Sequence, residues 1–216
     1  MSAEIIWIPP TGALLLGYLL GSIPFGVILT RLAGAGDLRQ IGSGNIGATN
    51  VLRTGRKGLA AATLLLDALK GFAAVLIAAL LFPGNALLAA AAAFIGHCYP
   101  AWLGFKGGKG VATLMGIVLA LHWPYGLIYA VVWLGLLAAL RISSVAGMTA
   151  AVSAPVAAAI CGRYDDVLLL IPLALIVLWK HRENIERLLA GTEPRVGGGK
   201  RADVDGGADG GGADGG

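Results

Sequence analysis

The stretch TGALLLGYLLGSIPFGVILTRLA, residues 11–33, decides the fold because it is apolar over a length that crosses a lipid bilayer. A helix needs about 20 apolar residues to span roughly 30 Å of hydrocarbon. The stretch is too long and too rich in glycine for a cleaved signal peptide. It also lacks a preceding basic segment and a clear small-residue cleavage site. We therefore predict a retained transmembrane helix.

The rest of the chain repeats this apolar character. Of its 216 residues, 57% are hydrophobic and only 13% are charged, which is too apolar for one soluble core. We predict an all-α integral membrane protein with seven transmembrane helices and find no internal repeat of the inverted kind. The predicted spans are residues 11–33, 59–82, 86–103, 111–122, 123–140, 145–161 and 166–180.

The cations indicate the orientation. With seven crossings, the cationic loops all fall on one side, which the positive-inside rule makes cytoplasmic. The N-terminus is then outside and the C-terminus inside. The cations on the predicted cytoplasmic side are Arg39, Arg53, Arg56, Lys57, Lys106, Lys109, Arg141, Lys180, Arg182 and Arg187.

One segment leaves two interpretations open. Residues 111–140 must cross twice with thirty residues, which is short for two spans. A re-entrant hairpin satisfies the charge pattern equally well, because zero and two crossings have the same parity.

The cysteines and the C-terminal segment offer no chemistry. Cys98 and Cys161 fall near opposite membrane faces, so we expect no disulfide between them, and no metal-ligand spacing is present. We expect one transmembrane domain over residues 1–194. Residues 195–216 are rich in glycine and aspartate, and we expect them to form a disordered tail.

Nearly all the unusual polar residues gather at the predicted cytoplasmic edge, where we place the active-site loops. They form four stretches: GSGNIGATNVLR at 42–53, GHCYPAWLGFKGGKGVAT at 96–113, RISS at 141–144 and KHRENIERL at 180–188. The glycines and asparagines of 42–50 suit a backbone that turns tightly and points N–H groups at an anion. A connecting loop capped by serine and asparagine fits that stretch as well.

The second stretch resembles a phosphate loop without being a Walker motif. Its spacing is one residue short of G-x-x-x-x-G-K, and Gly110 stands where a magnesium-binding hydroxyl belongs. Nucleotide hydrolysis is therefore excluded. Lys106 and Lys109 among glycines still fit a bound phosphate, although two snorkelling lysines at a helix end are the alternative.

Other polar residues suggest parts of a pocket. His97 and His181 both face the predicted cytoplasmic edge. A lone histidine there is more often a hydrogen-bonded helix end than a catalyst, but two that face one pocket favour a functional role more strongly. Asp67 and Lys70 lie three residues apart in an apolar span, so they can pair. We favour a structural ion pair for Asp67 and let Lys70 add to the positive field of the pocket. The chain has no G-x-S-x-G elbow and no H-x-x-x-x-D motif.

The motifs resemble one known family. The stretches at 42–53 and 96–113, with HRENIERLLAGTE at 181–193 and LDALKG at 66–71, resemble the bacterial acyl-phosphate-dependent glycerol-3-phosphate acyltransferases called PlsY. The resemblance covers residues 11–194 in the family's order. It implies a seven-helix enzyme of the cell inner membrane that moves a fatty acyl group from acyl phosphate to the 1-hydroxyl of glycerol 3-phosphate. The products would be lysophosphatidic acid and phosphate, in the first committed step of phospholipid synthesis.

The resemblance also implies partners and residue roles. It implies no cofactor, metal or nucleic acid, but contact with membrane lipid and transient contact with a soluble phosphate acyltransferase. The residues expected to be catalytic are Ser43, Asn45, Lys109, His181 and Asn184. Those expected to bind substrate are Gly44, Thr49, Asn50, Arg53, Lys70, His97, Lys106, Gly107, Gly108, Ser143 and Ser144.

Three points stay open. RISSVAG at 141–147 departs from the family's usual pattern, so either Ser143 or Ser144 makes the contact, and we choose Ser144. The resemblance implies that the phosphate of the acyl phosphate can accept the hydroxyl proton, which leaves no protein base assigned. A transporter or flippase for a phosphate-bearing solute is the rival, but its polar site belongs near the midplane rather than at one edge.

The orientation gives a first prediction. Cysteines engineered at positions 84 and 164 should react with an impermeant thiol reagent added outside, whereas cysteines at 55 and 108 should not, because the cations lie on the side of 55 and 108. Labelling of intact cells measures this. Reaction at 108 from outside would overturn the orientation.

Overall fold

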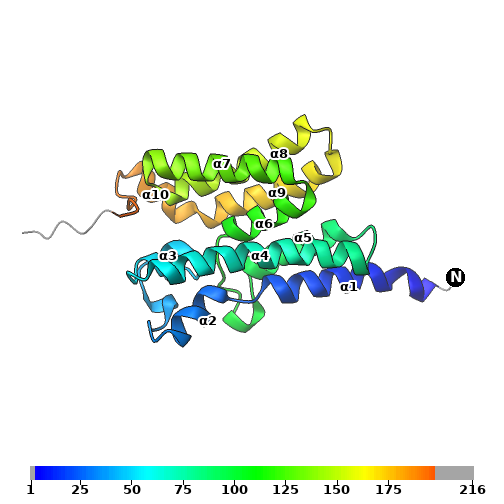
Figure 1. Cartoon of the computed structure of the whole chain (residues 1–216), viewed down its shortest axis with the longest axis horizontal. Coiled ribbons are helices and arrows are strands. Elements are labelled where there is room, and N and C mark those ends of the chain that lie inside the picture. Colours follow the sequence, from blue (N-terminus) through cyan, green and yellow to red (C-terminus); the bar gives the residue numbers. More distant parts are fainter. Residues whose placement is uncertain (1–2, 198–216) are drawn as a thin grey trace, which may run out of the picture.

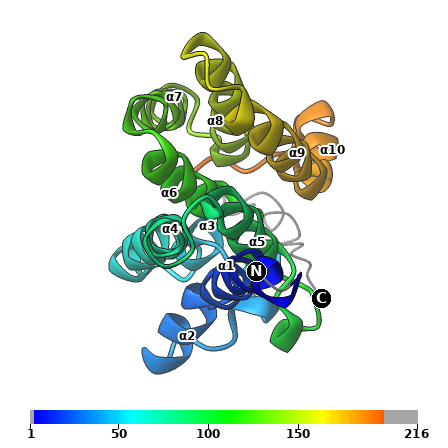
Figure 2. The ribbon, with the colours of Figure 1, turned by 90° about the vertical axis from the view of Figure 1, so that its right-hand side faces the viewer.

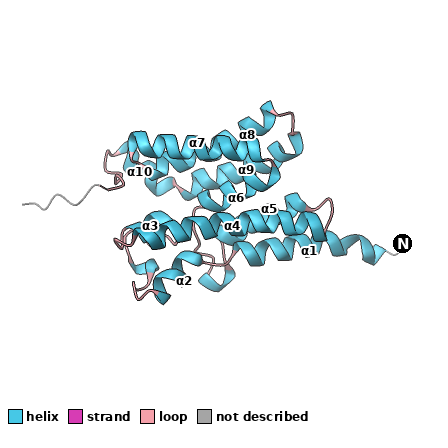
Figure 3. Ribbon diagram, viewed as in Figure 1, coloured by secondary structure: helices cyan, strands magenta, loops and turns pink. Residues whose placement is uncertain are grey.

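The computed structural model describes residues 3–197, which consist of helices, turns and loops (Figure 3). The prediction of an all-α protein is confirmed for this range. Two short 3-10 helices accompany the α-helices. The elements are α1 (Ala3–Gly21), α2 (Phe25–Leu32), η1 (Leu38–Gln40), α3 (Ala48–Leu52), α4 (Lys57–Leu81), α5 (Ala86–Cys98), η2 (Ala101–Leu103), α6 (Val111–Leu121), α7 (Trp123–Leu140), α8 (Ser143–Ile160), α9 (Tyr164–Lys180) and α10 (Arg182–Leu189).

The helices form two layers with α6 between them (Figures 1 and 2). Helices α1, α4 and α5 pack together in one layer, and α7, α8 and α9 pack in the other. Helix α6 contacts α4 on one side and α7 on the other. Its Leu114 and Ile117 are fully buried in the main core with Phe94 of α5 and Tyr129 of α7. The short helix α6 therefore joins the two layers.

Five segments of the described chain are long and apolar enough to cross a membrane: Trp7–Leu32, Lys57–Leu81, Ala86–Leu103, Trp123–Leu140 and Ser143–Ile160. Helix α6 has 11 residues and α9 has 17. Neither is among the five segments. Seven crossings and the orientation therefore stay predictions.

The first span is not the continuous helix that the sequence suggested. Helix α1 ends at Gly21 and α2 begins at Phe25, because Pro24 has no N–H with which to continue the helix. The break exposes backbone carbonyls that lipid cannot satisfy. The Trp102 indole donates to the Ser22 carbonyl at 2.8 Å, and the Lys70 ammonium donates to the Ile23 carbonyl at 2.7 Å. Two other segments therefore hold the break in place.

The segment 111–140 folds as two helices joined at His122, whose backbone is extended. At 1.5 Å per residue, α6 is about 16 Å long and α7 about 27 Å long. Because both helices meet at His122, α6 begins roughly 10 Å short of the level where α7 ends. The start of α6 is therefore recessed from the end of the bundle.

Helices α1 and α5 approach closely through small residues. Gly17 and Gly21 lie one turn apart on α1, opposite Ala89 and Ala93 of α5. A Cβ on Gly17 would overlap the Ala89 carbonyl, and one on Gly21 would overlap the Ala93 carbonyl. Such small-residue seams let backbones pack where the lipid provides no hydrophobic drive.

This seam gives a second prediction. Gly21→Leu should lower the thermal unfolding temperature in detergent, because overpacking costs about 1–3 kcal/mol and the obstacle here is backbone. Gly135→Leu is the matched control, since a Cβ on this helical glycine of α7 meets open space. Equal unfolding temperatures for the two variants would contradict the packing account.

Candidate functional site

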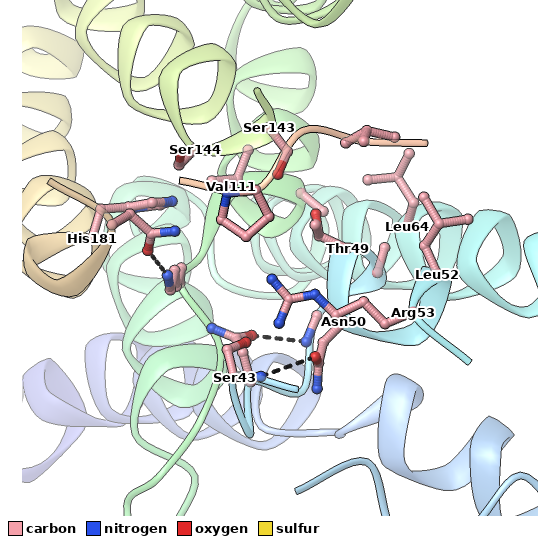
Figure 4. A pocket seen from close by; sticks show the side chains of 18 of the residues that line it. Ser43, Thr49, Asn50, Leu52, Arg53, Leu64, Val111, Ser143, Ser144 and His181 are labelled. Carbon is pink, nitrogen blue, oxygen red and sulfur yellow. Dashed lines mark hydrogen bonds between the residues drawn. The ribbon is translucent and has the colours of Figure 1, made fainter. Parts of the chain in front are cut away.

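A cavity of about 680 Å³ opens where α3, α4, α6, α8 and α10 come together. Figure 4 shows Arg53 and Thr49 on one side of it and His181 and Ser144 on another. The four polar stretches of the sequence all contribute to its wall. The predicted site residues that line it are Ser43, Asn45, Thr49, Asn50, Arg53, His97, Lys109, Ser143, Ser144, His181 and Asn184. Their roles toward a substrate stay predictions.

The loop before α3 is built around Asn50. The buried amide of Asn50 donates to the carbonyls of Leu38 at 3.0 Å and Ile41 at 2.8 Å, and its oxygen accepts from the Ser43 N–H at 3.4 Å. Gly42 and Gly44 have positive φ, which lets the chain turn around this amide. Asn50 therefore shapes the loop, and its polar atoms are already used.

Other groups of this loop are available to a ligand. Among the described residues, no side-chain hydrogen bond is formed by Ser43 Oγ, Thr49 Oγ1 or the Arg53 guanidinium. All three side chains are exposed and line the cavity. Asn45 lines it too, and its oxygen accepts from the Gly47 N–H at 2.9 Å. Gly44, in contrast, serves the turn and is not part of the wall.

In the stretch that resembles a phosphate loop, two glycine N–H groups are bound to backbone carbonyls, whereas the sequence suggested that they bind phosphate. The N–H groups of Gly107 and Gly108 donate to the carbonyls of Cys98 at 3.2 Å and His97 at 3.0 Å, so they do not point at an anion. A Cβ on either glycine would overlap the end of α5. Lys106 is exposed and lies outside the cavity wall. The glycines therefore hold the loop tightly against α5.

The N–H groups available to an anion come a few residues later. Gly110 has φ of 84° and turns the chain into α6, whose first backbone bond runs from the Leu114 N–H to the Gly110 carbonyl at 2.7 Å. The N–H groups before Leu114 have no partner inside the helix. Gly110, Val111 and Ala112 line the cavity. The start of α6 thus presents N–H groups and a positive dipole end to it.

Lys109 is the lysine of this loop that enters the cavity. Its ammonium donates to the Asn184 side-chain oxygen of α10. Burial, followed by the charge of Arg187, lowers the pKa of Lys109 to about 8. Lys109 is therefore mostly charged at neutral pH and shares the cavity with other cations.

His181 is neutral in this cavity. Burial, followed by the charge of Lys109, lowers the pKa of His181 to about 4. Its Nδ1 lies 2.8 Å from the Val177 carbonyl, which can only accept, so Nδ1 carries the proton. Nε2 then holds a lone pair.

Glu193 is the residue that sequence reasoning missed. Its carboxylate accepts hydrogen bonds from Ser144 Oγ at 2.7 Å, Asn184 Nδ2 at 2.6 Å and Arg187 Nε at 2.8 Å. Burial acts to raise the pKa of Glu193, but these three donors outweigh it, and the pKa lies below its ordinary value. The sequence clue to this role was an acidic residue two positions after Gly191. Gly191 has positive φ after the end of α10 and turns the chain back toward the cations of the cavity.

Ser143 and Ser144 both line the cavity but differ in their bonding. Ser144 is buried and bound to Glu193, whereas Ser143 is half-buried and forms no side-chain hydrogen bond among the described residues. The preference for Ser144 as the substrate contact stays a prediction.

The C-terminal segment closes one side of the cavity. Pro194 to Gly197 line it, and the Val196 N–H donates to the Arg141 carbonyl at 2.7 Å. The Arg141 guanidinium donates back to the Val196 carbonyl at 3.1 Å. Residues 195–197 of the expected tail thus contact the rest of the protein, and the domain boundary stays a prediction. The remainder of the expected tail, 198–216, lies outside the described residues.

The predicted residues Asp67, Lys70 and His97 lie at or next to the cavity wall. Asp67 and His97 line it, but Lys70 does not. The Lys70 ammonium lies 2.7 Å from Asp67 Oδ1, so the expected ion pair is present and Lys70 is engaged within the protein. An apolar wall completes the cavity and consists of Leu52, Leu64, Val111 and Trp133.

Comparison with known proteins gives a consistent answer. A family model described as glycerol-3-phosphate acyltransferase matches residues 11–191. A glycerol-3-phosphate acyltransferase of Novosphingobium aromaticivorans is 70% identical over 184 residues, which is 85% of this chain and 93% of that protein. One from Erythrobacter litoralis is 60% identical over 188 residues, covering 87% of this chain and 95% of the relative.

Two solved structures are similar as well. Both are crystal structures of PlsY, an integral membrane glycerol 3-phosphate acyltransferase. Its glycerol 3-phosphate form has a TM-score of 0.82 at 41% identity, covering 87% of this chain and 96% of that one. Its lysophosphatidic acid form has a TM-score of 0.80 at 39% identity, covering 87% and 95%.

Proposed function

This chain belongs to the glycerol-3-phosphate acyltransferase family, and we propose that it transfers a fatty acyl group from an acyl phosphate to the 1-hydroxyl of sn-glycerol 3-phosphate in the cell's inner membrane. It is a multi-pass membrane acyltransferase of the PlsY type. The observation that carries the proposal is a cavity with cations and a helix N-terminus on one wall and apolar side chains on another. Both substrates bear phosphate, and one bears an acyl chain.

The phosphate side of the cavity supports two anionic substrates. Lys109, Arg53 and Arg187 line it with the N-terminal end of α6. Among these cations, Arg187 is bound to Glu193 and Lys109 contacts a neutral amide, whereas the exposed Arg53 guanidinium is available. A lysine and helix N–H groups suit a phosphate that becomes a leaving group, because they stabilise charge as it develops.

The apolar side supports an acyl chain. Leu64 lies seven residues after the first residue of α4, and Trp133 lies seven residues before the last residue of α7. Both are therefore about 10–12 Å from the polar end of their helices. An acyl chain lying along Leu52, Leu64 and Trp133 would place its carbonyl near Lys109 and Ser43, where the phosphate groups bind.

The reaction itself needs little from a protein base. His181, with a pKa of about 4, is a weak base at neutral pH. This favours proton acceptance by the phosphate of the donor while the hydroxyl attacks the acyl carbon and the carbon–oxygen bond to phosphate breaks. His181, Asn184 and Ser43 then orient the reacting groups.

A donor comparison tests the proposal. Purified protein with glycerol 3-phosphate should release phosphate and form lysophosphatidic acid from palmitoyl phosphate, with much lower turnover from palmitoyl-CoA or palmitoyl-acyl carrier protein. Quantifying both products for each donor measures this. No phosphate release, or a clear preference for palmitoyl-CoA, would refute the acyl-phosphate assignment.

The two loop lysines give a matched pair of variants. Lys109→Ala should lower turnover by about 10²–10³-fold, as loss of one charge-stabilising donor does in oxyanion-type sites. Lys106→Ala should stay within about twofold of wild type, because Lys106 lies outside the cavity wall. Steady-state kinetics at equal protein amounts measure both. Equal losses in the two variants would mean that the loop binds phosphate as the sequence alone suggested.

A further inference from the structure

A buried polar cluster lies beneath the cavity. Asp67 and Lys70 of α4 and His97 of α5 are 3%, 4% and 4% exposed, although all three lie within apolar spans. Burying charged groups is costly unless they are paired. The cluster therefore needs an explanation that the proposed phosphate and acyl subsites do not supply.

The ion pair explains only part of it. The Lys70 ammonium balances the Asp67 carboxylate at 2.7 Å and donates to the Ile23 carbonyl at the break of the first span. Lys70 is not part of the cavity wall, whereas Asp67 is. A purely structural pair would not need its carboxylate at the edge of a ligand cavity.

His97 faces that carboxylate with an unused nitrogen. Its Nδ1 is buried, lacks a hydrogen-bond partner among the described residues and lies 3.8 Å from Asp67 Oδ1. A lone pair on Nδ1 would face an anionic oxygen and be repelled, whereas an N–H there is attracted. Because Lys70 already balances Asp67, a neutral imidazole keeps the cluster neutral. The proton therefore belongs on Nδ1.

The other ring nitrogen lies beside the loop that carries Lys109. A Cβ on Gly108 would overlap Nε2 of His97, so only glycine leaves this nitrogen space. The Gly108 N–H donates to the His97 backbone carbonyl, which ties the loop to the end of α5. With the proton on Nδ1, Nε2 carries a lone pair, and His97 lines the cavity.

We propose that Asp67 is a positioning residue, which holds the proton of His97 on Nδ1 so that Nε2 accepts a hydrogen bond from a hydroxyl group of the acceptor substrate. The inference rests on the proposed function, since it takes the acceptor to be a small phosphorylated polyol. Lys109, Arg53 and the start of α6 then select its phosphate, and His97 selects its hydroxyl.

A charge-neutral double variant separates positioning from simple ion pairing. Asp67→Leu/Lys70→Met removes both charges, and such replacements of buried pairs often leave stability unchanged. Lys70→Met alone keeps Asp67 and is the control for the lost hydrogen bond to the Ile23 carbonyl. The KM for glycerol 3-phosphate should rise about tenfold, as expected for loss of one hydrogen bond, while the KM for palmitoyl phosphate changes less than about twofold. Thermal unfolding in detergent confirms folding. A folded double variant with a wild-type KM for glycerol 3-phosphate would refute the inference.

If the double variant fails to fold, two His97 variants test whether Nε2 binds the acceptor hydroxyl. An asparagine amide reaches the level of Nδ1, and a glutamine amide reaches the level of Nε2. His97→Gln should therefore keep a lower KM for glycerol 3-phosphate than His97→Asn. Equal KM values, or a wild-type value for His97→Asn, would overturn the proposal. If wild-type protein shows no turnover, the proposed function itself fails, whereas normal variants of an active enzyme refute only the role of Asp67.

Discussion

The rest of the site depends on two interactions of the Lys70 ammonium, its hydrogen bond to the Ile23 carbonyl and its ion pair with Asp67. A bilayer tolerates a broken helix only where other groups satisfy the freed carbonyls. Lys70 does this for Ile23 while it balances Asp67, and Trp102 does it for Ser22. The break lets α2 leave the line of α1 and carry the chain into the loop around Asn50. One wall of the cavity thus follows from a satisfied break in the first span.

The opposite wall is a hydrogen-bonded chain that links segments far apart in the sequence. Lys109 donates a hydrogen bond to Asn184, and Asn184 donates one to Glu193. Glu193 also accepts hydrogen bonds from Ser144 and Arg187. The segment after α10, the start of α6 and the start of α8 are thereby held at fixed positions. Because Glu193 already accepts from three donors of this wall, an entering phosphate finds unshared partners elsewhere, among them Arg53 and the N–H groups of α6. The internal anion keeps the cations close together before substrate binds.

The local pattern of apolar and polar residues predicted most of the helices and the stretches that form the cavity. Apolar length located the long helices after the first span, and the predicted span 59–82 differs from α4 by only two residues at one end and one at the other. The polar stretches at 42–53, 96–113, 141–144 and 180–188 do meet at one cavity. Prediction failed where a residue's neighbours in sequence did not reveal its neighbours in space. Lys106 and Lys109 look equivalent in the loop, yet only Lys109 reaches the cavity. Glu193 gave only a weak local signal, and Ser144 of α8, one of its three partners, lies far from it in the sequence.

The sequence by itself determined that this chain is a helical membrane protein whose polar groups gather near the ends of its apolar segments, because hydrophobicity and charge act on each segment separately. Motif order alone also indicated the family. Only the tertiary structure decided which groups are free to bind a ligand. The N–H groups of Gly107 and Gly108 are consumed by carbonyls of α5, while those at the start of α6 are not. Whether a polar group is available depends on what packs against it, and that depends on contacts between helices rather than on local sequence.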